Sequence, residues 1–252
     1  MSTRRFHVDD LSPPIVSIGG TQAHHAIRVL RMKAGDSVVL FDGSGREALG
    51  TIESTRSDSF VVRIRRRERV DSPSESRLAL AVAPPKGTRG DWLVEKCAEI
   101  GVAVLQPLVC ERSQVLPRTT KIERWRRKAI EAAKQARRAV PMRVEEPLPL
   151  NEVLTRAGGK AGILFGDPDP SCPILTELLI SQKDSALEMA IILIGPEGGF
   201  APAERDHMVH LDGQAVRLNT GILRVETAAV VAAAIWTAWC DARCTKCPIS
   251  DA

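Results

Sequence analysis

The sequence predicts an α/β fold in which a small antiparallel β-barrel domain precedes a parallel sheet covered by helices. Short strands joined by tight turns fill residues 1–70, whereas apolar strands alternate with helices further along the chain. The first pattern favours a small barrel, and the second favours a parallel sheet covered on both faces. The polar segment 71–76, DSPSES, separates the two patterns. We therefore expect domains at 1–72 and 77–240, followed by a tail at 241–252.

The first domain is expected to be mostly β, with one short helix at 21–31. Ala26, Ile27 and Leu30 give that helix an apolar face. Asp42-Gly43 is a strong signal for a tight turn between strands. The strands are expected at 5–8, 37–41, 48–54 and 60–65.

The second domain is expected to alternate strands and helices. Its first helix places Leu93, Val94 and Cys97 on one face, and Gly101 is suited to end it. Strands are expected at 78–83, 102–109, 162–165, 190–194 and 215–218. Helices are expected at 91–100, 120–138, 151–157, 202–210 and 224–239.

Positive charge is concentrated in two segments of the chain. The formal net charge is +4, yet residues 1–70 alone carry +4 and residues 118–138 carry +7. Such clusters indicate a polyanionic partner, with nucleic acid as the first candidate. The alternative is that each cluster is only a solvated face.

The amino terminus, MSTRRFHVDD, has no apolar stretch of the kind found in signal peptides. The longest nearly apolar run, at 228–240, is shorter than the ~18–20 residues of a membrane span. We therefore expect a cytoplasmic protein with no membrane partner.

Six cysteines without a secretory signal indicate reduced thiols. Cys240, Cys244 and Cys247 have the spacing C-x3-C-x2-C, which can hold an iron–sulfur cluster. The alternative is a helix end followed by a loose tail. Because the three cysteines lie in the last 13 residues, at and beyond the end of the second expected domain, we expect no metal site.

Two glycine-bearing segments follow buried strands and are the strongest functional signal. Residues 191–200, IILIGPEGGF, run from an apolar strand into a glycine-rich turn. Residues 216–234, VRLNTGILRVETAAVVAAA, combine a short strand, a tight turn and a helix of small residues. Both expose backbone at a strand end, where α/β proteins hold ligands. Phosphate-loop, dinucleotide and G-x-S-x-G patterns do not occur, which removes the common nucleotide and hydrolase interpretations.

Arg224 and Glu226 begin the helix that follows the second turn. A carboxylate at the positive end of a helix is favourable, whereas an arginine there is not. A functional role would explain why an arginine occupies this unfavourable position. The alternative is that Arg224 and Glu226 form a structural ion pair.

These motifs resemble a known family. GPEGGF, ILRVETA, KGTRGDWLVEKCAEIGV and KIERWRRKAIEAAKQ are similar to those of the ribosomal small-subunit RNA methyltransferase E family, of the SPOUT class. The resemblance runs from about Arg4 to Trp236 and includes RRF and HHAIRVLRMKAGD in the first domain. It implies a PUA-like barrel, a carboxyl-terminal trefoil knot and a homodimer. It also implies S-adenosylmethionine-dependent methylation of uridine N3 in the decoding-region helix of 16S ribosomal RNA, within the 30S subunit or as free RNA.

The position of Arg224 and Glu226 at a helix start beside the second turn leads to a hypothesis for such a reaction. Arg224 would stabilise the uracil anion through a carbonyl oxygen, and Glu226 would orient Arg224 or accept the N3 proton. The resemblance itself implies the residues that contact the cofactor and RNA. The cofactor would contact Leu164, Phe165, Gly166, Ile194, Gly195, Pro196, Glu197, Gly198, Gly199, Leu218, Asn219, Gly221, Ile222 and Leu223. RNA would contact Arg4, Arg5, Arg28, Arg31, Lys86, Arg89 and Arg112.

The chain departs from the family pattern at two places. Asn219-Thr220-Gly221 stands where the family usually has G-x-R, which removes one possible substrate or donor contact. Ala136-Arg137-Arg138 stands where it tends toward a small residue, glycine and arginine. Three alternatives stay open: a non-catalytic RNA-binding or assembly factor, a SPOUT methyltransferase acting on another RNA site, and a small-molecule enzyme with an α/β fold.

Overall fold

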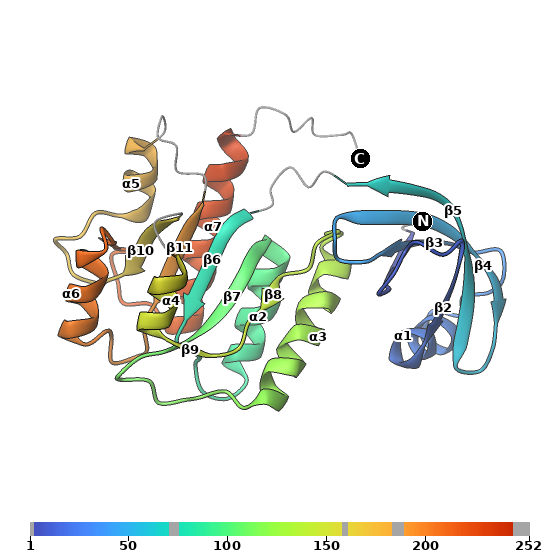
Figure 1. Ribbon diagram of the computed structural model, residues 1–252, viewed down its shortest axis with the longest axis horizontal. Coiled ribbons are helices and arrows are strands. Elements are labelled where there is room, and N and C mark those ends of the chain that lie inside the picture. Colours follow the sequence, from blue (N-terminus) through green and yellow to red (C-terminus); the bar gives the residue numbers. More distant parts are fainter. Residues whose placement is uncertain (1–2, 71–75, 158–160, 183–188, 244–252) are drawn as a thin grey trace. The chain divides into compact units, whose positions relative to one another are not determined.

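The computed structural model describes residues 3–70, 76–157, 161–182 and 189–243, and it divides into two compact units (Figure 1). Unit 1 comprises Met1–Ser72 and Ala133–Pro141, and unit 2 comprises Pro73–Ala132 and Met142–Ala252. Residues 133–141, which we placed in the second domain, therefore group with the first unit. Most of the expected boundary segment, and most of the expected tail, lie outside the described residues.

Unit 1 is built on a curled five-stranded sheet (Figure 1). Its elements are β1 (Arg4–His7), β2 (Ile15–Gly19), α1 (Gly20–His24), the π-helical turn η1 (His25–Val29), β3 (Ser37–Phe41), β4 (Arg46–Thr55) and β5 (Ser59–Arg69). The strand order is β1-β3-β4-β5-β2, and all neighbours except β1 and β3 are antiparallel. Phe6, Leu40, Phe60 and Val62 form its core with small residues of α1 and η1.

Two elements of unit 1 differ from the sequence-based expectation. The strand β2 was missed because it buries only Ile18, so its alternation is weak. The helix expected at 21–31 divides into α1 and η1. Leu30 N–H donates to the His25 carbonyl at 3.0 Å, which is an i→i−5 bond, and Arg31 then takes a left-handed φ of 54°.

Unit 2 contains the expected parallel sheet. Its strands are β6 (Ser76–Val82), β7 (Val102–Val109), β8 (Arg143–Val144), β9 (Leu148–Pro149), β10 (Gly162–Gly166), β11 (Ala190–Ile194) and β12 (Gln214–Val216). They follow the order β12-β10-β11-β6-β7-β8, with β9 also paired to β7, and every pair is parallel. The two-residue strands β8 and β9 are too short to leave a periodic signal and were missed.

Helices cover both faces of this sheet. They are α2 (Arg89–Ile100), α3 (Thr119–Gln135), α4 (Leu150–Ala157), α5 (Leu175–Ser181), α6 (Pro202–His210) and α7 (Val225–Arg243). On β11, Ile192 joins the core formed with α2, α3, α5 and α7, whereas Leu193 joins the core formed with α4 and α6. The continuous apolar run of β11 therefore reflects a strand buried on both sides. Helix α5 was missed because only seven residues form it.

Two helices end at left-handed residues. Gly101, with φ of 101°, ends α2 as expected. The helix expected to run to residue 138 instead ends at Gln135, because Arg137 has φ of 55° and Arg138 N–H donates to the Ala133 carbonyl at 2.9 Å. The departure from the family pattern at Arg137 thus falls on a backbone conformation that favours glycine.

By length and composition, α7 could cross a membrane, and in the described part of the chain it is alone in this. Its packing gives a different reason for its apolar composition. Ala229, Ala232, Ala233 and Trp236 are fully buried in the core of unit 2.

Candidate functional site

A cavity of about 500 Å³ opens at the carboxyl ends of β10, β11 and β12. These three strands are adjacent and parallel, so their following loops meet at one edge of the sheet. The volume lies within the range of small-molecule sites. The cavity is lined by Gly166, Asp167, Pro168, Ile194, Gly195, Pro196, Glu197, Gly198, Gly199, Phe200, Leu218, Asn219, Gly221, Ile222, Leu223, Arg224, Val225 and Ala228.

The structure brings most of the expected cofactor residues into this one wall. Leu164 and Phe165 are the exceptions, because both are buried in the cores on opposite faces of the sheet. Sequence reasoning missed five lining residues, of which Asp167 had a usable signal because it directly follows the strand end at Gly166. The others are Pro168, Phe200, Val225 and Ala228.

The first glycine turn has a fixed backbone. Gly199 has φ of 69°, and its N–H donates to the Pro196 carbonyl at 2.8 Å. A Cβ on Gly195 would lie 3.1 Å from the Phe200 ring, so this residue must stay small for the ring to pack. At the end of the turn, Ala201 N–H donates to the Glu204 carboxylate at 2.8 Å, at the positive end of α6. The glycines here serve the shape of the turn.

The second turn is more open. Asn219 Oδ1 accepts the Thr220 N–H at 2.7 Å, so the residues that depart from the family pattern shape the turn locally. A Cβ on Gly221 would meet no atom within 4 Å, and its φ is not in the left-handed region. Ile222 is 88% exposed. Neither packing nor backbone conformation therefore requires a glycine at position 221. The missing side chain leaves open space beside the cavity that Gly221 lines.

Asp167 places a buried carboxylate in the cavity wall. Its side chain pairs with Arg205 Nη2 at 2.6 Å, and its Oδ1 accepts the Asp169 N–H at 3.0 Å. Its own N–H donates to the Val216 carbonyl at 2.9 Å, which ties the β10 and β12 loops together. The charge of Asp167 is thus matched within the fold.

The two expected catalytic residues lie in different environments. Arg224 is exposed in the cavity wall, and the part of the chain that the structure describes gives its guanidinium no ion pair. Glu226 is buried, and its Oε1 lies 3.7 Å from Arg89 Nη1 rather than beside Arg224. Its Oε2 has no hydrogen-bond partner among the described residues.

The residues expected to contact RNA are distributed over both units. In unit 1, Arg4, Arg28 and Arg31 are exposed, whereas Arg5 pairs with Glu47 and stacks on the Phe41 ring at 5.3 Å. The Arg5 guanidinium therefore already has a carboxylate partner.

In unit 2, Lys86 and Arg112 are exposed, and Arg89 is half-buried. Arg112 Nη1 donates to the Gly198 carbonyl at 2.8 Å, so an expected RNA contact is attached to the first glycine turn.

The structure shows no metal-binding group of His, Cys, Asp or Glu within the described ranges. Cys240 is half-buried, and Cys244 and Cys247 lie outside those ranges. Burial raises the pKa of the Cys97 and Cys110 thiols to about 12. These two side chains are therefore neutral packing groups near neutral pH.

Comparison with known proteins gives matches over both units. Residues 72–237 match the family described as RNA methyltransferase domain, and residues 18–65 match the RNA methyltransferase PUA domain. The Ribosomal RNA small subunit methyltransferase E of Synechocystis sp. is 33% identical over 223 residues, which cover 87% of this chain and 71% of that protein. The protein of the same name from Bacillus subtilis is 28% identical over 87% of this chain and 88% of its own length.

Solved structures agree with these matches. A Ribosomal RNA small subunit methyltransferase E from Neisseria gonorrhoeae, bound to S-adenosyl methionine, has a TM-score of 0.82, 25% identity, and coverage of 92% of this chain and 96% of its own. A putative methyltransferase from Legionella pneumophila, in complex with the cofactor SAM, has a TM-score of 0.81, 27% identity, and coverage of 94% and 98%.

The matches confirm the expected fold class, a PUA-like domain followed by a SPOUT-type parallel sheet. One family thus accounts for the strand-end cavity and for the β-rich first unit. The chain belongs to the ribosomal RNA small subunit methyltransferase E family.

Proposed function

We propose that this protein transfers a methyl group from S-adenosylmethionine to N3 of one uridine in the decoding-region helix of 16S ribosomal RNA. The observation that carries the proposal is the cavity between the two glycine turns, with Arg224 in its wall. The names of the relatives support the small-subunit RNA and the donor. The choice of uridine N3 rests on the family resemblance of GPEGGF and ILRVETA.

The residues present fit the donor. The cavity is of suitable size, and Gly199 and Gly221 leave open space where a side chain would otherwise stand. The turns at 195–199 and 218–223 would hold the donor, mostly through backbone groups and the apolar side chains of Leu218, Ile222 and Leu223. When bound, the donor supplies an electrophilic methyl group on a sulfonium.

The two charged residues would prepare the uracil. N3 of uridine keeps its proton at neutral pH, so the base must lose it to become a nucleophile. Arg224, exposed in the cavity wall, would stabilise the resulting anion at a carbonyl oxygen. Glu226 would accept the proton through Oε2, which has no hydrogen-bond partner in the described structure. The alternative role, in which Glu226 orients Arg224, is less favoured because Glu226 contacts Arg89 and not Arg224.

Exposed cations on both units support RNA as the substrate. Arg4, Arg28 and Arg31 of unit 1 and Lys86 of unit 2 are exposed and suited to phosphates. A target base in a paired region would have to leave the helical stack. We expect a homodimer in the cytoplasm, and the partly exposed apolar residues Val231, Ala234 and Ile235 on α7 support a subunit interface.

Calorimetry followed by methyl transfer tests the proposal. We expect S-adenosylmethionine to bind the isolated protein and radioactive methyl to reach 16S RNA, presented as 30S subunits or as free RNA. Binding of RNA should weaken steeply between 50 and 200 mM salt, because phosphate contacts release counterions, by roughly 10³-fold or more for six or more contacts. A non-catalytic assembly factor would bind RNA without the donor, and a small-molecule enzyme would bind no RNA.

A further inference from the structure

Arg89 lies between the first glycine turn and the buried carboxylate of Glu226. It is the first residue of α2. Its Nη2 lies 3.7 Å from Glu197 Oε1, and its Nη1 lies 3.7 Å from Glu226 Oε1. One guanidinium thus faces carboxylates from two segments that are about thirty residues apart in sequence.

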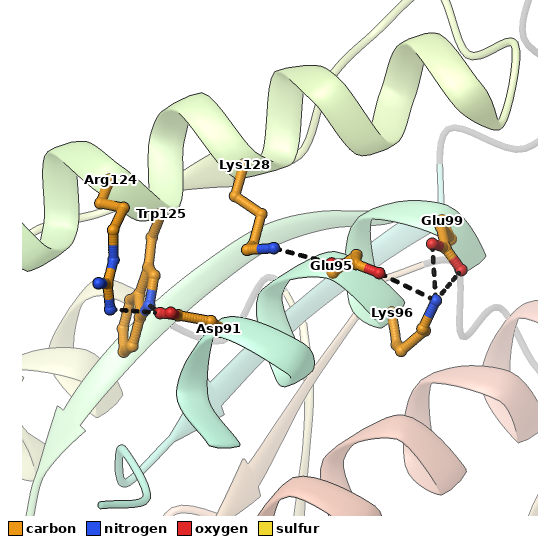
Figure 2. Close-up of polar contacts among 7 residues, drawn as sticks. All are labelled: Asp91, Glu95, Lys96, Glu99, Arg124, Trp125 and Lys128. Atoms are coloured by element: carbon orange, nitrogen blue, oxygen red, sulfur yellow. Dashed lines mark hydrogen bonds and ion pairs between the residues drawn. The ribbon is translucent and has the colours of Figure 1, made fainter. Parts of the chain in front are cut away.

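The neighbouring acid on α2 is engaged elsewhere. Asp91 Oδ1 accepts hydrogen bonds from Trp125 Nε1 and from Arg124 Nη2, each at 2.8 Å (Figure 2). Arg89 is left with Glu197 and Glu226 as its acidic partners in the described structure.

Helix α3 holds the first turn of α2 in place. Besides the bonds to Asp91, the Trp125 ring packs so closely on Gly90 that a Cβ there would lie 2.6 Å from Trp125 Cζ2. Trp125 is 2% exposed. The two residues that directly follow Arg89, Gly90 and Asp91, are therefore both held against α3.

The ion pairs of Arg89 are loose. A separation of 3.7 Å is too long for a hydrogen bond, and the Arg89 side chain is 37% exposed. The Glu226 side chain is only 9% exposed, and its other oxygen has no hydrogen-bond partner in the described structure. A buried carboxylate in this condition gains from any movement that brings the guanidinium closer. The planar fork of arginine can serve two carboxylates at once, which a lysine ammonium does less well.

We propose that Arg89 is a positioning residue that couples the donor turn, through Glu197, to Glu226. Because the backbone of the turn at 195–199 is already fixed, donor binding there would restrict the exposed Glu197 side chain and draw Arg89 into closer contact with both carboxylates. Glu226 would then be held in place for its role when the donor site is filled. This inference rests on the proposed function and gives Arg89 a role distinct from the expected RNA contact.

The first experiment measures thermal unfolding of the full chain without donor or RNA. It compares Arg89→Met, Glu226→Gln and the double variant with the unchanged protein. We expect Arg89→Met to lower the melting temperature in the presence of Glu226, and to have little effect in the Glu226→Gln background. Additive effects would show that the two side chains do not interact and would overturn the inference.

The second experiment measures donor affinity by calorimetry without RNA. Arg89→Met and Glu197→Gln should each raise the dissociation constant of the donor about fivefold, as expected for a partly exposed ion pair. The double variant should have the same dissociation constant as either single variant. Arg89→Lys keeps the positive charge and should recover part of the donor affinity. It therefore serves as a control in case Arg89→Met does not fold properly. Lys96→Met is the matched control, because Lys96 also pairs with two carboxylates on α2, those of Glu95 and Glu99 (Figure 2), and it should bind the donor normally.

The third experiment separates positioning from RNA contact. At saturating donor and RNA, Arg89→Met should lower the single-turnover rate about tenfold while RNA affinity changes less than twofold. Normal donor affinity with a loss confined to RNA affinity would make Arg89 an RNA contact and overturn the inference. The outcomes are distinguishable from failure of the proposed function, because the unfolding and donor-binding measurements use no RNA.

Discussion

Arg89 and Asp91 stand two residues apart on the first turn of α2, yet their ionic contacts are opposite in character. Asp91 makes two bonds of 2.8 Å to α3 and is mostly buried, whereas Arg89 makes two contacts of 3.7 Å, one to the first glycine turn and one to α7. Short, satisfied contacts stabilise a fold, and long contacts around a buried, unsatisfied carboxylate are suited to change when a ligand binds. One helix turn thus carries a structural anchor on one side and a functional contact on the other.

The largest effect expected is on the functional side. Glu226→Gln should lower the single-turnover rate of methyl transfer about a hundredfold, because it removes the proposed general base. The melting temperature should not fall, since a neutral amide replaces a poorly paired buried charge. Unchanged single-turnover methylation with normal RNA binding would remove the proton-acceptor role and weaken the contrast with Asp91.

The structural side should show the reverse behaviour. Asp91→Ala should reduce the free energy of unfolding by about 2 kcal/mol, because it leaves the buried Trp125 N–H without an acceptor. Glu95→Ala is the control on the same helix. Its partners, Lys96 and Lys128, are solvent-accessible, so urea unfolding should show a much smaller loss. Equal losses in the two variants would mean that the Asp91 anchor is only another surface pair.

The contact between Gly90 and Trp125 gives a smaller effect. In Gly90→Ala, the collision with Trp125 should cost about 1–3 kcal/mol, against roughly 1 kcal/mol that alanine gains over glycine within a helix. We expect a net loss of about 1 kcal/mol in urea unfolding. Adding Trp125→Phe removes the atom that collides, so the loss from Gly90→Ala should largely disappear in that background. Full additivity would contradict the close packing.

The ends of α2 and α3 give the smallest expected effect. Gly101 and Arg137 both have left-handed backbone, but only glycine takes it without strain. Arg137→Gly should therefore stabilise the chain by about 0.5 kcal/mol, after the added freedom of the unfolded glycine is counted. A fall in melting temperature would show that the side-chain contacts of Arg137 outweigh the strain.

The cavity was more predictable from sequence than the contacts behind it. Glycine and proline act locally, so the turn at 195–199 could be recognised directly and most of the cavity lining followed. Phe200 directly follows that turn and packs on Gly195, so it could have been included. Ala228 was missed because its place in the wall depends on how α7 packs against the sheet. The contact of Arg89 with Glu226 has no local signal, since α2 and α7 are far apart in sequence.

In the fold, the same distinction between local and long-range signals holds. Strand β11 and helix α6 were predicted with their observed bounds, because an apolar run and an N-terminal proline mark them. The end of α3 was predicted three residues too late, since no sequence signal announces an arginine with positive φ. Strand β2 was missed because one buried residue does not make a pattern.

Mapping the methylated nucleotide tests the central claim most directly. The protein is incubated with S-adenosylmethionine and 30S subunits that lack the modification, and the 16S RNA is digested and analysed by mass spectrometry. We expect one new N3-methyluridine, located in the decoding-region helix, and its much slower formation by the Glu226→Gln variant. A methyl group on another atom or in another RNA segment, or no transfer from a donor that binds, would contradict the proposed function.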